Sequence, residues 1–394
     1  MDKRLVKVEH LHLSTLRREG LEWYEEGENM GYIANTFVKL NSSEIGKFKA
    51  AATALHREAL EAAFYLKKYQ KWHEAGIPSN AVPAIEYSLE NELDNFLVGR
   101  FDFAGGIDGL SIKFLEYNAD GCTLMQETAT IQELHYLQEQ NKLKREPKYK
   151  LIEALYQRFR YILQKNPEKE PFLLVSTLGY KEDELNVQVV IKAAKLAGFQ
   201  EVRYETLENV TFSENDGIFL EAENGEYLKY DFWYKLIPWE FIAFEEPELM
   251  KILTDISRNG KAVIMNPAFS MAMQCKSITK YMYDLFPKNP YLLKTTFNQS
   301  SFPGGHYVQK PIFGRLGENI RFFQGNLSPT EETEGDYGHH RSVYQEIAEF
   351  NIDSEDHRYQ PSIYHTGVPG CIGIRRQDDL IIDDDAEFVG HTIM

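Results

Sequence analysis

The chain has 394 residues, 43% of them hydrophobic, which suffices to bury the core of one large composite domain or of two to three ordinary ones. Sixty acidic against 43 basic residues give a formal net charge of −17, so the chain repels nucleic-acid phosphates and anionic lipids, and we expect neither as a partner. Its three scattered cysteines form no C-x-x-C pair, which argues against a disulfide framework and a structural zinc site.

The N-terminal residues lack the apolar core of a signal peptide, and no stretch approaches the ~20 apolar residues that a membrane span needs. We therefore expect a cytoplasmic protein. The short basic stretch Lys142–Lys150 is interpreted as a solvated helix junction.

Residues 1–165 are predicted to hold helices and a hairpin. Apolar residues at three- and four-residue spacing predict a helix from Ser42 to His73, with Ser42 or Ser43 as its N-cap and a stop at Gly76.

Two strand-like runs follow this helix, Asn95–Asp102 and Ser111–Asn118, and the glycine-rich turn between them predicts a hairpin. Two further helices are predicted at Thr128–Lys144 and Tyr149–Gln164.

Residues 166–265 alternate strands with a helix. PFLLVSTLGY is a buried-type strand, NVQVVIKAAKLAGF is a helix, and EVRYETL, GIFLEA and KAVIMN supply further strands. This order predicts a βαβ layer with a parallel sheet.

Residues 266–350 are predicted to begin with a helix, Gln274–Leu285, and to contain a polar loop of about twenty residues, Gln324–Ser342. Such a long loop is usually a functional lid or disordered. Residues 351–394 are expected to alternate short strands with glycine-rich turns.

The hairpin carries the first candidate site. Arg100 and Asp102 share one face of a strand, as do Glu116 and Asn118, and strand pairing would bring Asp102, Glu116 and Asn118 together. Two carboxylates and an amide oxygen suit Mg²⁺. The alternative, solvent-facing polar residues of a half-buried hairpin, has more weight on the pattern alone.

A second candidate is the run YVQKPIFGRLGEN, in which a strand brings Lys310 to a loop containing Gly314 and Gly317. Glycines allow backbone N–H groups to approach phosphate oxygens, and the lysine adds a charge. The run lacks the GKS or GKT ending of a P-loop, and a surface hairpin with a bulge is the alternative.

Two weaker candidates follow. Gln345, Glu346 and Ile347 could contact an adenine edge or form an ordinary strand with polar faces. Arg375 precedes a triple aspartate; the arginine can stabilise a reacting phosphate, and the aspartates either attract a cationic amine or form a solvated turn.

Taken in order, R-x-D, EYNAD, NPAF with a lysine seven residues on, KPIFGRLGEN, YQE and GIGIRRQDDLI resemble the synthetase part of the glutathionylspermidine synthase family. The resemblance runs from about Glu22 to the C-terminus. It implies an ATP-grasp fold of the α+β or α/β class, with a βαβ pre-ATP-grasp-like layer and a mobile lobe that covers the nucleotide. It also implies a ligase that phosphorylates a carboxylate with ATP and lets an amine attack the acyl phosphate.

The resemblance assigns roles to residues of this chain. It implies ATP and two Mg²⁺ ions as cofactors, with Asp102, Glu116 and Asn118 as metal ligands. Arg100 and Arg375 resemble the arginines that hold the transferred phosphoryl group. The residues that resemble ATP contacts are Lys276, Lys310, Gly314, Gly317, Gln345, Glu346, Ile347, Leu380, Ile381 and Ile382.

The substrate side departs from the family pattern. Gly121 stands where the family has a serine-containing loop, and Leu236 stands at the threonine of the family's WKTWAWE motif. Glu182 and Glu387 correspond loosely to acids on the polyamine side. Members with two domains also carry an N-terminal amidase, which we expect to be absent here, so any opposing hydrolysis lies elsewhere.

Three functions stay open on the sequence: a working ligase for a small or peptide carboxylate and an amine, an inactive nucleotide-binding relative, and a small-metabolite kinase with the same ATP lobe. The complete set of predicted metal and lysine positions favours the ligase. The sequence names neither substrate and leaves open whether the chain forms a homodimer.

Overall fold

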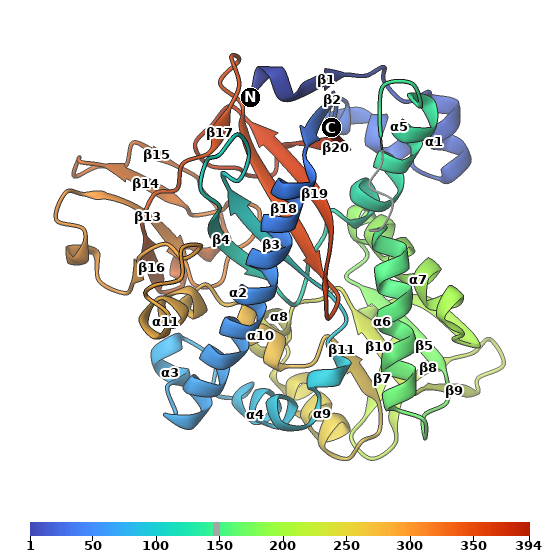
Figure 1. Cartoon of the computed structure of the whole chain (residues 1–394). Helices are drawn as coiled ribbons and strands as arrows, with labels where there is room; N and C mark the ends of the chain where they lie inside the picture. The colour runs from blue at the N-terminus through green and yellow to red at the C-terminus, as the bar shows by residue number, and fades with distance from the viewer. Residues whose placement is uncertain (145–149) are drawn as a thin grey trace.

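The computed structural model describes residues 1–144 and 150–394, which form four sheets with helices packed around them (Figure 1). The largest sheet has the order β1-β2-β20-β19-β18-β3-β4, with β17 paired to β18. Strands from both ends of the chain therefore share one sheet. Its strands are β1 (Leu5–Lys7), β2 (Ile33–Leu40), β3 (Gly99–Ala104), β4 (Lys113–Asn118), β17 (Asn351–Ile352), β18 (Arg358–His365), β19 (Pro369–Gln377) and β20 (Glu387–Ile393).

A four-stranded parallel sheet, in the order β11-β10-β5-β6, confirms the predicted βαβ layer. Helix α7 connects β5 to β6, and α6 packs against α7. The elements are β5 (Phe172–Thr177), β6 (Glu201–Thr206), β10 (Phe232–Lys235), β11 (Val263–Met265), α6 (Leu151–Lys165) and α7 (Lys181–Ala197).

One predicted strand lies in a different sheet. GIFLEA forms β8 (Gly217–Glu221), which pairs with β7 (Val210–Ser213) and β9 (Tyr227–Tyr230) in a small antiparallel sheet. The strand that pairs with β5 instead is β10, for which the sequence pattern gave no prediction. All four residues of β10 are buried, as expected for a strand covered on both faces, whereas β8 is partly exposed.

The remaining sheet has the order β12-β16-β13-β14-β15. It contains part of the polar stretch Gln324–Ser342, which is therefore not a structureless loop: β15 pairs with β14, and the 3-10 helix η8 follows. The elements are β12 (Thr295–Thr296), β13 (His306–Pro311), β14 (Arg321–Gln324), β15 (Glu331–Glu332), β16 (Ser342–Gln345) and η8 (Asp336–His339).

Helix α2 (Ser42–Lys68) lies across the largest sheet and packs on β18 and β19 (Figure 1). Its N-cap is Asn41, one residue before the predicted cap, because Asn41 and Glu44 form a reciprocal capping box. The helix predicted to continue to His73 ends at Lys68. The predicted stop, Gly76 with φ +80°, closes a separate short helix, α3 (Trp72–Ala75).

Two predicted helices are interrupted. The first begins as a π-helix, η5 (Glu127–Ile131), and ends with α5 at Gln138 rather than at Lys144. The helix predicted at Gln274–Leu285 forms α11 (Ser277–Leu285), and Gln274 instead ends a preceding helix, α10, because Cys275 leaves the helical conformation. The start predicted at Tyr149 and most of the basic stretch Lys142–Lys150 lie outside the described residues.

The other helices pack around these sheets, and within the described residues none is long and apolar enough to cross a membrane. They are α1 (Leu13–Glu19), α4 (Val82–Asn91), α5 (Gln132–Gln138), α8 (Trp239–Glu245), α9 (Pro247–Arg258), α10 (Phe269–Gln274), α11 (Ser277–Leu285), and the 3-10 helices η1 (Asp2–Arg4), η2 (Glu22–Glu25), η3 (Gly27–Asn29), η4 (Leu93–Asn95), η6 (Leu207–Asn209) and η7 (Gln299–Ser301).

Buried histidines make the core sensitive to acid. His135 on α5 is 1% exposed and packs edge-on against Phe37 of β2. Neither of its ring nitrogens has a hydrogen-bond partner within the described part of the chain. Burial lowers the pKa of His135 to about 4, and burial likewise lowers that of His391 to about 4.

We expect the free energy of unfolding to fall as the pH drops from about 6.5 towards 4, because these histidines take up protons only in the unfolded chain. At about pH 5.5 each histidine should cost about 1 kcal/mol relative to pH 7. His135→Leu should flatten this dependence in urea titrations, whereas His73→Leu, at an exposed position, should leave it unchanged. Equal slopes in all three proteins would contradict the assignment.

Candidate active site

A cavity lies where β3 and β4 meet the five-stranded sheet and the stretch that follows β19. It brings together most of the residues predicted from sequence to contact ATP or metal. The predicted residues that line it are Arg100, Glu116, Asn118, Gly121, Lys276, Lys310, Gly314, Gly317, Gln345, Glu346, Arg375, Leu380, Ile381 and Ile382.

The predicted metal ligands converge. Asp102 faces Glu116 in the β3–β4 register, and the amide nitrogen of Asn118 donates to Asp102 Oδ2 at 3.0 Å. Arg100 binds both oxygens of Asp102, with Nε–Oδ1 at 2.8 Å and Nη2–Oδ2 at 2.9 Å. Asp102 is fully buried behind the cavity wall, so only Glu116 and Asn118 face the cavity directly.

This donor set is chemically suited to Mg²⁺, since it offers carboxylate and amide oxygens. Burial alone would raise the pKa of Glu116, but Lys276 and Lys310 together lower it below its usual range, so the carboxylate is ionised. Among the described residues, no group of three or more His, Cys, Asp or Glu side chains gathers to hold a metal. A metal here would therefore depend on Asn118 and on groups from its ligand.

Two lysines project into the cavity from different elements. Lys276, at the break between α10 and α11, lies 3.2 Å from Glu116 Oε2 and donates to the carbonyl oxygen of Gly314 at 2.6 Å. Lys310 of β13 donates to Gln345 Oε1 at 2.8 Å. Burial, reinforced by the charge of Lys276 and opposed by Glu116, lowers the pKa of Lys310 to about 8.

The glycine loop, Gly314–Gly317, follows Lys310 and contacts Lys276 through the carbonyl oxygen of Gly314. Gly317 has φ +74°, and a Cβ there would come within 2.7 Å of the Cβ of Asp383, so only glycine fits without strain. Arg315, which was not predicted as a site residue, donates from Nη2 to the carbonyl oxygen of Gly121 at 2.9 Å. Its position between two glycines of the loop was the only signal for it in the sequence.

The polar segment after β14 is held on this loop by hydrogen bonds. Thr333 Oγ1 donates to the carbonyl oxygen of Gly317 at 2.6 Å, and the backbone N–H of Tyr337 donates to Asn319 Oδ1 at 2.8 Å. Side-chain and backbone bonds thus order a segment that has almost no apolar residues to bury.

An apolar wall forms one end of the cavity. Val308, Phe322 and Ile381 pack together there, and Ile347 lies against this cluster. Gln345 and Glu346 lie beside it and offer polar groups. A flat aromatic ring with hydrogen-bonding edges suits this end.

A second cavity adjoins the first, and Arg100 and Arg375 line both. Glu182 and Glu387 lie in it, so two residues predicted on the amine side are brought together. Burial and the neighbouring carboxylates raise the pKa of Glu182 to about 7. Leu236, by contrast, is buried in the core beneath the parallel sheet and lines neither cavity.

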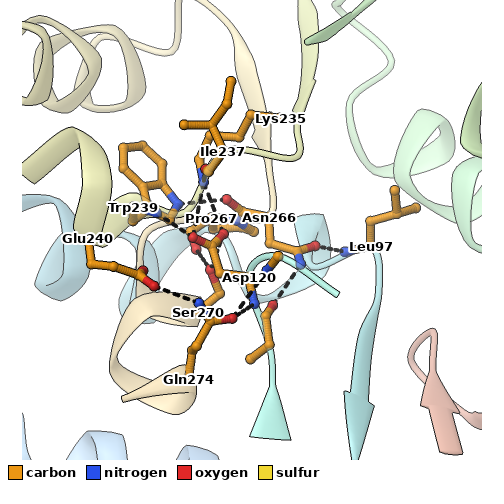
Figure 2. Close-up of polar contacts among 12 residues, drawn as sticks. Leu97, Asp120, Lys235, Ile237, Trp239, Glu240, Asn266, Pro267, Ser270 and Gln274 are labelled. Carbon is orange, nitrogen blue, oxygen red and sulfur yellow. Dashed lines mark hydrogen bonds and ion pairs between the residues drawn. The ribbon is translucent and has the colours of Figure 1, made fainter. Parts of the chain in front are cut away.

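Beneath the site lies a buried network that joins three parts of the fold (Figure 2). Asp120, just after β4, pairs with Lys235 of β10 at 3.0 Å, and both side chains are fully buried. Asp120 also accepts from the backbone N–H of Trp239 at 2.5 Å and from Ser270 Oγ at 3.0 Å.

Asn266 and Gln274 extend this network. The side chain of Asn266 accepts from the backbone N–H of Leu97 and donates to the carbonyl oxygen of Ala119, while Gln274 accepts from the N–H groups of Asp120 and Gly121 (Figure 2). Asp120 lies in EYNAD, Lys235 lies in the run that matches the family's WKTWAWE motif, and Asn266 lies in NPAF, which Ser270 and Gln274 follow. Sequence reasoning therefore identified the motifs but missed this structural role.

Comparison with known proteins agrees with the geometry. The family model described as "Glutathionylspermidine synthase preATP-grasp" matches residues 3–394. A protein of Haemophilus influenzae named as a putative acid–amine ligase is 26% identical over 371 residues, which cover 91% of this chain and 89% of that protein.

The bifunctional glutathionylspermidine synthetase/amidase of Escherichia coli is 24% identical over 333 residues, covering 79% of this chain and 51% of that enzyme. The chain thus matches about half the length of the bifunctional protein. Among solved structures, a glutathione synthetase-like effector of Globodera pallida superposes with a TM-score of 0.53 at 10% identity, covering 91% of this chain and 89% of that one. That likeness concerns the fold alone.

We expect nucleotide affinity to be constant below about pH 8 and to fall at higher pH. The phosphates of a bound nucleotide should raise the pKa of Lys310, so the protonated lysine favours binding and its deprotonation opposes it. Lys310→Met should weaken binding of a non-hydrolysable ATP analogue at least about tenfold and remove this dependence. Calorimetric titration between about pH 7 and about pH 9 measures both, with exposed Lys288→Met as the control.

Breaking the buried pair should destabilise the whole fold. Asp120→Asn leaves the charge of Lys235 buried without a counter-ion, which should cost about 3–5 kcal/mol in denaturant titrations. The control is the half-exposed pair of Arg321 and Glu332, where Glu332→Gln should cost at most about 1 kcal/mol. Similar losses at the two pairs would show that the buried network has no special role.

Proposed function

Because the chain belongs to the glutathionylspermidine synthase family, we propose that it is an ATP-dependent acid–amine ligase whose reaction passes through an acyl phosphate. One observation carries the proposal. Arg100 and Arg375 line two adjoining cavities, one rich in lysine and apolar walls, the other rich in carboxylates. A phosphorylated carboxylate held between these arginines would be within reach of ligands in both cavities.

The first cavity would receive the nucleotide. Its apolar end and Gln345 suit the adenine, and Lys276, Lys310 and the N–H groups of the glycine loop suit the phosphates. Mg²⁺ held by Glu116 and Asn118, with Asp102 behind them, would neutralise charge on the transferred phosphoryl group. Arg315 would close the glycine loop onto Gly121 and exclude water from the acyl phosphate.

The second cavity would receive the amine. Glu182, Asp384 and Asp385 line it beside Arg375, together with Glu387, which pairs with Arg376. This excess of carboxylates suits a cation but not a second carboxylic acid. The names of several relatives specify glutathione and spermidine. Gly121 and the buried Leu236 replace residues that the family uses for glutathione, so we propose that this chain acts on a related but different acid.

The ligase hypothesis is tested by measuring ADP release with amino acids, short peptides, glutathione and polyamines, and by identifying products by mass spectrometry. Glu116→Gln should lower turnover by about 10³-fold or more, because charge on the phosphoryl group is then left unneutralised. Its circular dichroism should not change. The exposed Glu334→Gln is the matched control.

Turnover of Glu116→Gln within a few-fold of the wild-type protein would exclude the metal assignment. Release of ADP that needs an acid but forms a stable phosphorylated product, with no amide, would instead identify a kinase.

A further inference from the structure

Glu127, at the start of the π-helix η5, is a buried carboxylate to which the reaction so far gives no role. Its side chain is 1% exposed and lines the second cavity. Tyr32 donates its hydroxyl to Glu127 Oε1 at 2.8 Å, whereas no donor lies within hydrogen-bond distance of Glu127 Oε2 among residues 1–144 and 150–394. The buried Tyr24 hydroxyl is near enough to lower the pKa of Glu127, but it also lacks a partner at that distance. A buried carboxylate oxygen without a donor is costly, so a donor supplied by a ligand would be strongly favoured.

The surroundings of Glu127 select a cationic donor. Burial raises the pKa of Glu127, and a backbone hydrogen bond, the hydroxyls of Tyr32 and Tyr24 and the charge of Arg100 oppose that rise. The carboxylates that line the same cavity are Glu127, Glu182, Asp384, Asp385 and Glu387. Arg100 is already paired with Asp102, and Glu387 with Arg376. Glu127, Glu182, Asp384 and Asp385 therefore outnumber Arg375, the other arginine at the border.

Glu127 also lies near enough to Arg100 for the charge of the arginine to lower the pKa of Glu127. The carbonyl oxygen of Thr123, four residues before Glu127, accepts from Arg100 Nη1 at 3.0 Å and from the Tyr364 hydroxyl at 2.7 Å. A single short stretch of backbone therefore connects the phosphate-side arginine to this carboxylate.

We propose that Glu127 Oε2 binds the ammonium group of the amine substrate and accepts the proton that this group must lose before it attacks. The inference rests on the proposed ligase function. The ammonium gives one proton to Glu127, and the nitrogen lone pair forms the C–N bond to the acyl carbon. The C–O bond to phosphate then breaks, phosphate leaves with the electron pair, and the second N–H proton leaves with it. The products are the amide, hydrogen phosphate and protonated Glu127, which later releases its proton to water.

The test compares two nucleophiles in the full-length protein with Glu127→Gln, a change that preserves size and the acceptor for Tyr32. Hydroxylamine is uncharged at neutral pH, so it traps an acyl phosphate as a hydroxamate without a cation site or a base. With Mg-ATP and the acids of the functional screen, Glu127→Gln should form hydroxamate within about twofold of the wild-type rate. Amide formation with spermidine should fall by about 10²–10⁴-fold.

Glu133→Gln is the control, because Glu133 lies on the adjoining helix α5, outside the second cavity and 3.9 Å from Lys150. Amide formation within a few-fold of wild type in Glu127→Gln would overturn the proposal. An equal fall in hydroxamate and amide formation would also overturn it. Glu127 would then act in forming the acyl phosphate or in stabilising the fold.

Absence of hydroxamate from the wild-type protein with every acid would refute the ligase function instead. Calorimetric titration with spermidine then tests Glu127 by itself: at least tenfold weaker binding to Glu127→Gln supports the amine site. Equal affinity, or no binding of spermidine to the wild-type protein, overturns it.

Discussion

The buried ion pair between Asp120 and Lys235 is the interaction on which the rest of the site depends. Asp120 follows the strand that carries Glu116 and Asn118, whereas Lys235 ends a strand of the parallel layer. Apolar packing also joins the two layers, since one hydrophobic cluster contains Phe101 of β3 and Trp233 of β10. The charge pair adds directed hydrogen bonds to this packing, and removal of either partner would leave a buried charge unpaired. The pair thus positions the strand that carries Glu116 and Asn118 against the parallel layer.

The distribution of charge explains how one site can hold a polyanion and a cation together. Lysines are concentrated in the cavity beside the glycine loop, carboxylates in the adjoining one, and arginines at the border. Arg100 is neutralised by Asp102, but Arg375 Nε has no partner within the described residues. Arg375 Nη1 donates to the carbonyl oxygen of Asp383 at 3.2 Å. A guanidinium with an N–H group still available at such a border is suited to a group that develops negative charge during a reaction.

Local patterns in the sequence predicted the hairpin, the βαβ layer and the residues around the glycine loop, because strand alternation and loop chemistry are short-range properties. Long-range partners were not predictable in this way. Nothing local to Phe232–Lys235 showed that this strand, and not Gly217–Glu221, pairs with Phe172–Thr177. The polar segment after Gln324 has few apolar residues, so its sequence did not predict an ordered structure. The groups that order it lie in the glycine loop and the residues that follow it. Leu236 matched a motif position but faces the core.

The position of the last strand has a consequence for how the chain is made. Glu387–Ile393 lies inside the largest sheet, between β19 and the parallel strand β2 from near the N-terminus. The sheet that carries the β3–β4 hairpin can therefore be completed only after Glu387–Ile393 has been synthesised and has left the ribosome. Until then β2 and β19 present unpaired edges, so the nascent chain is exposed to misassembly and depends on rapid pairing once this strand appears.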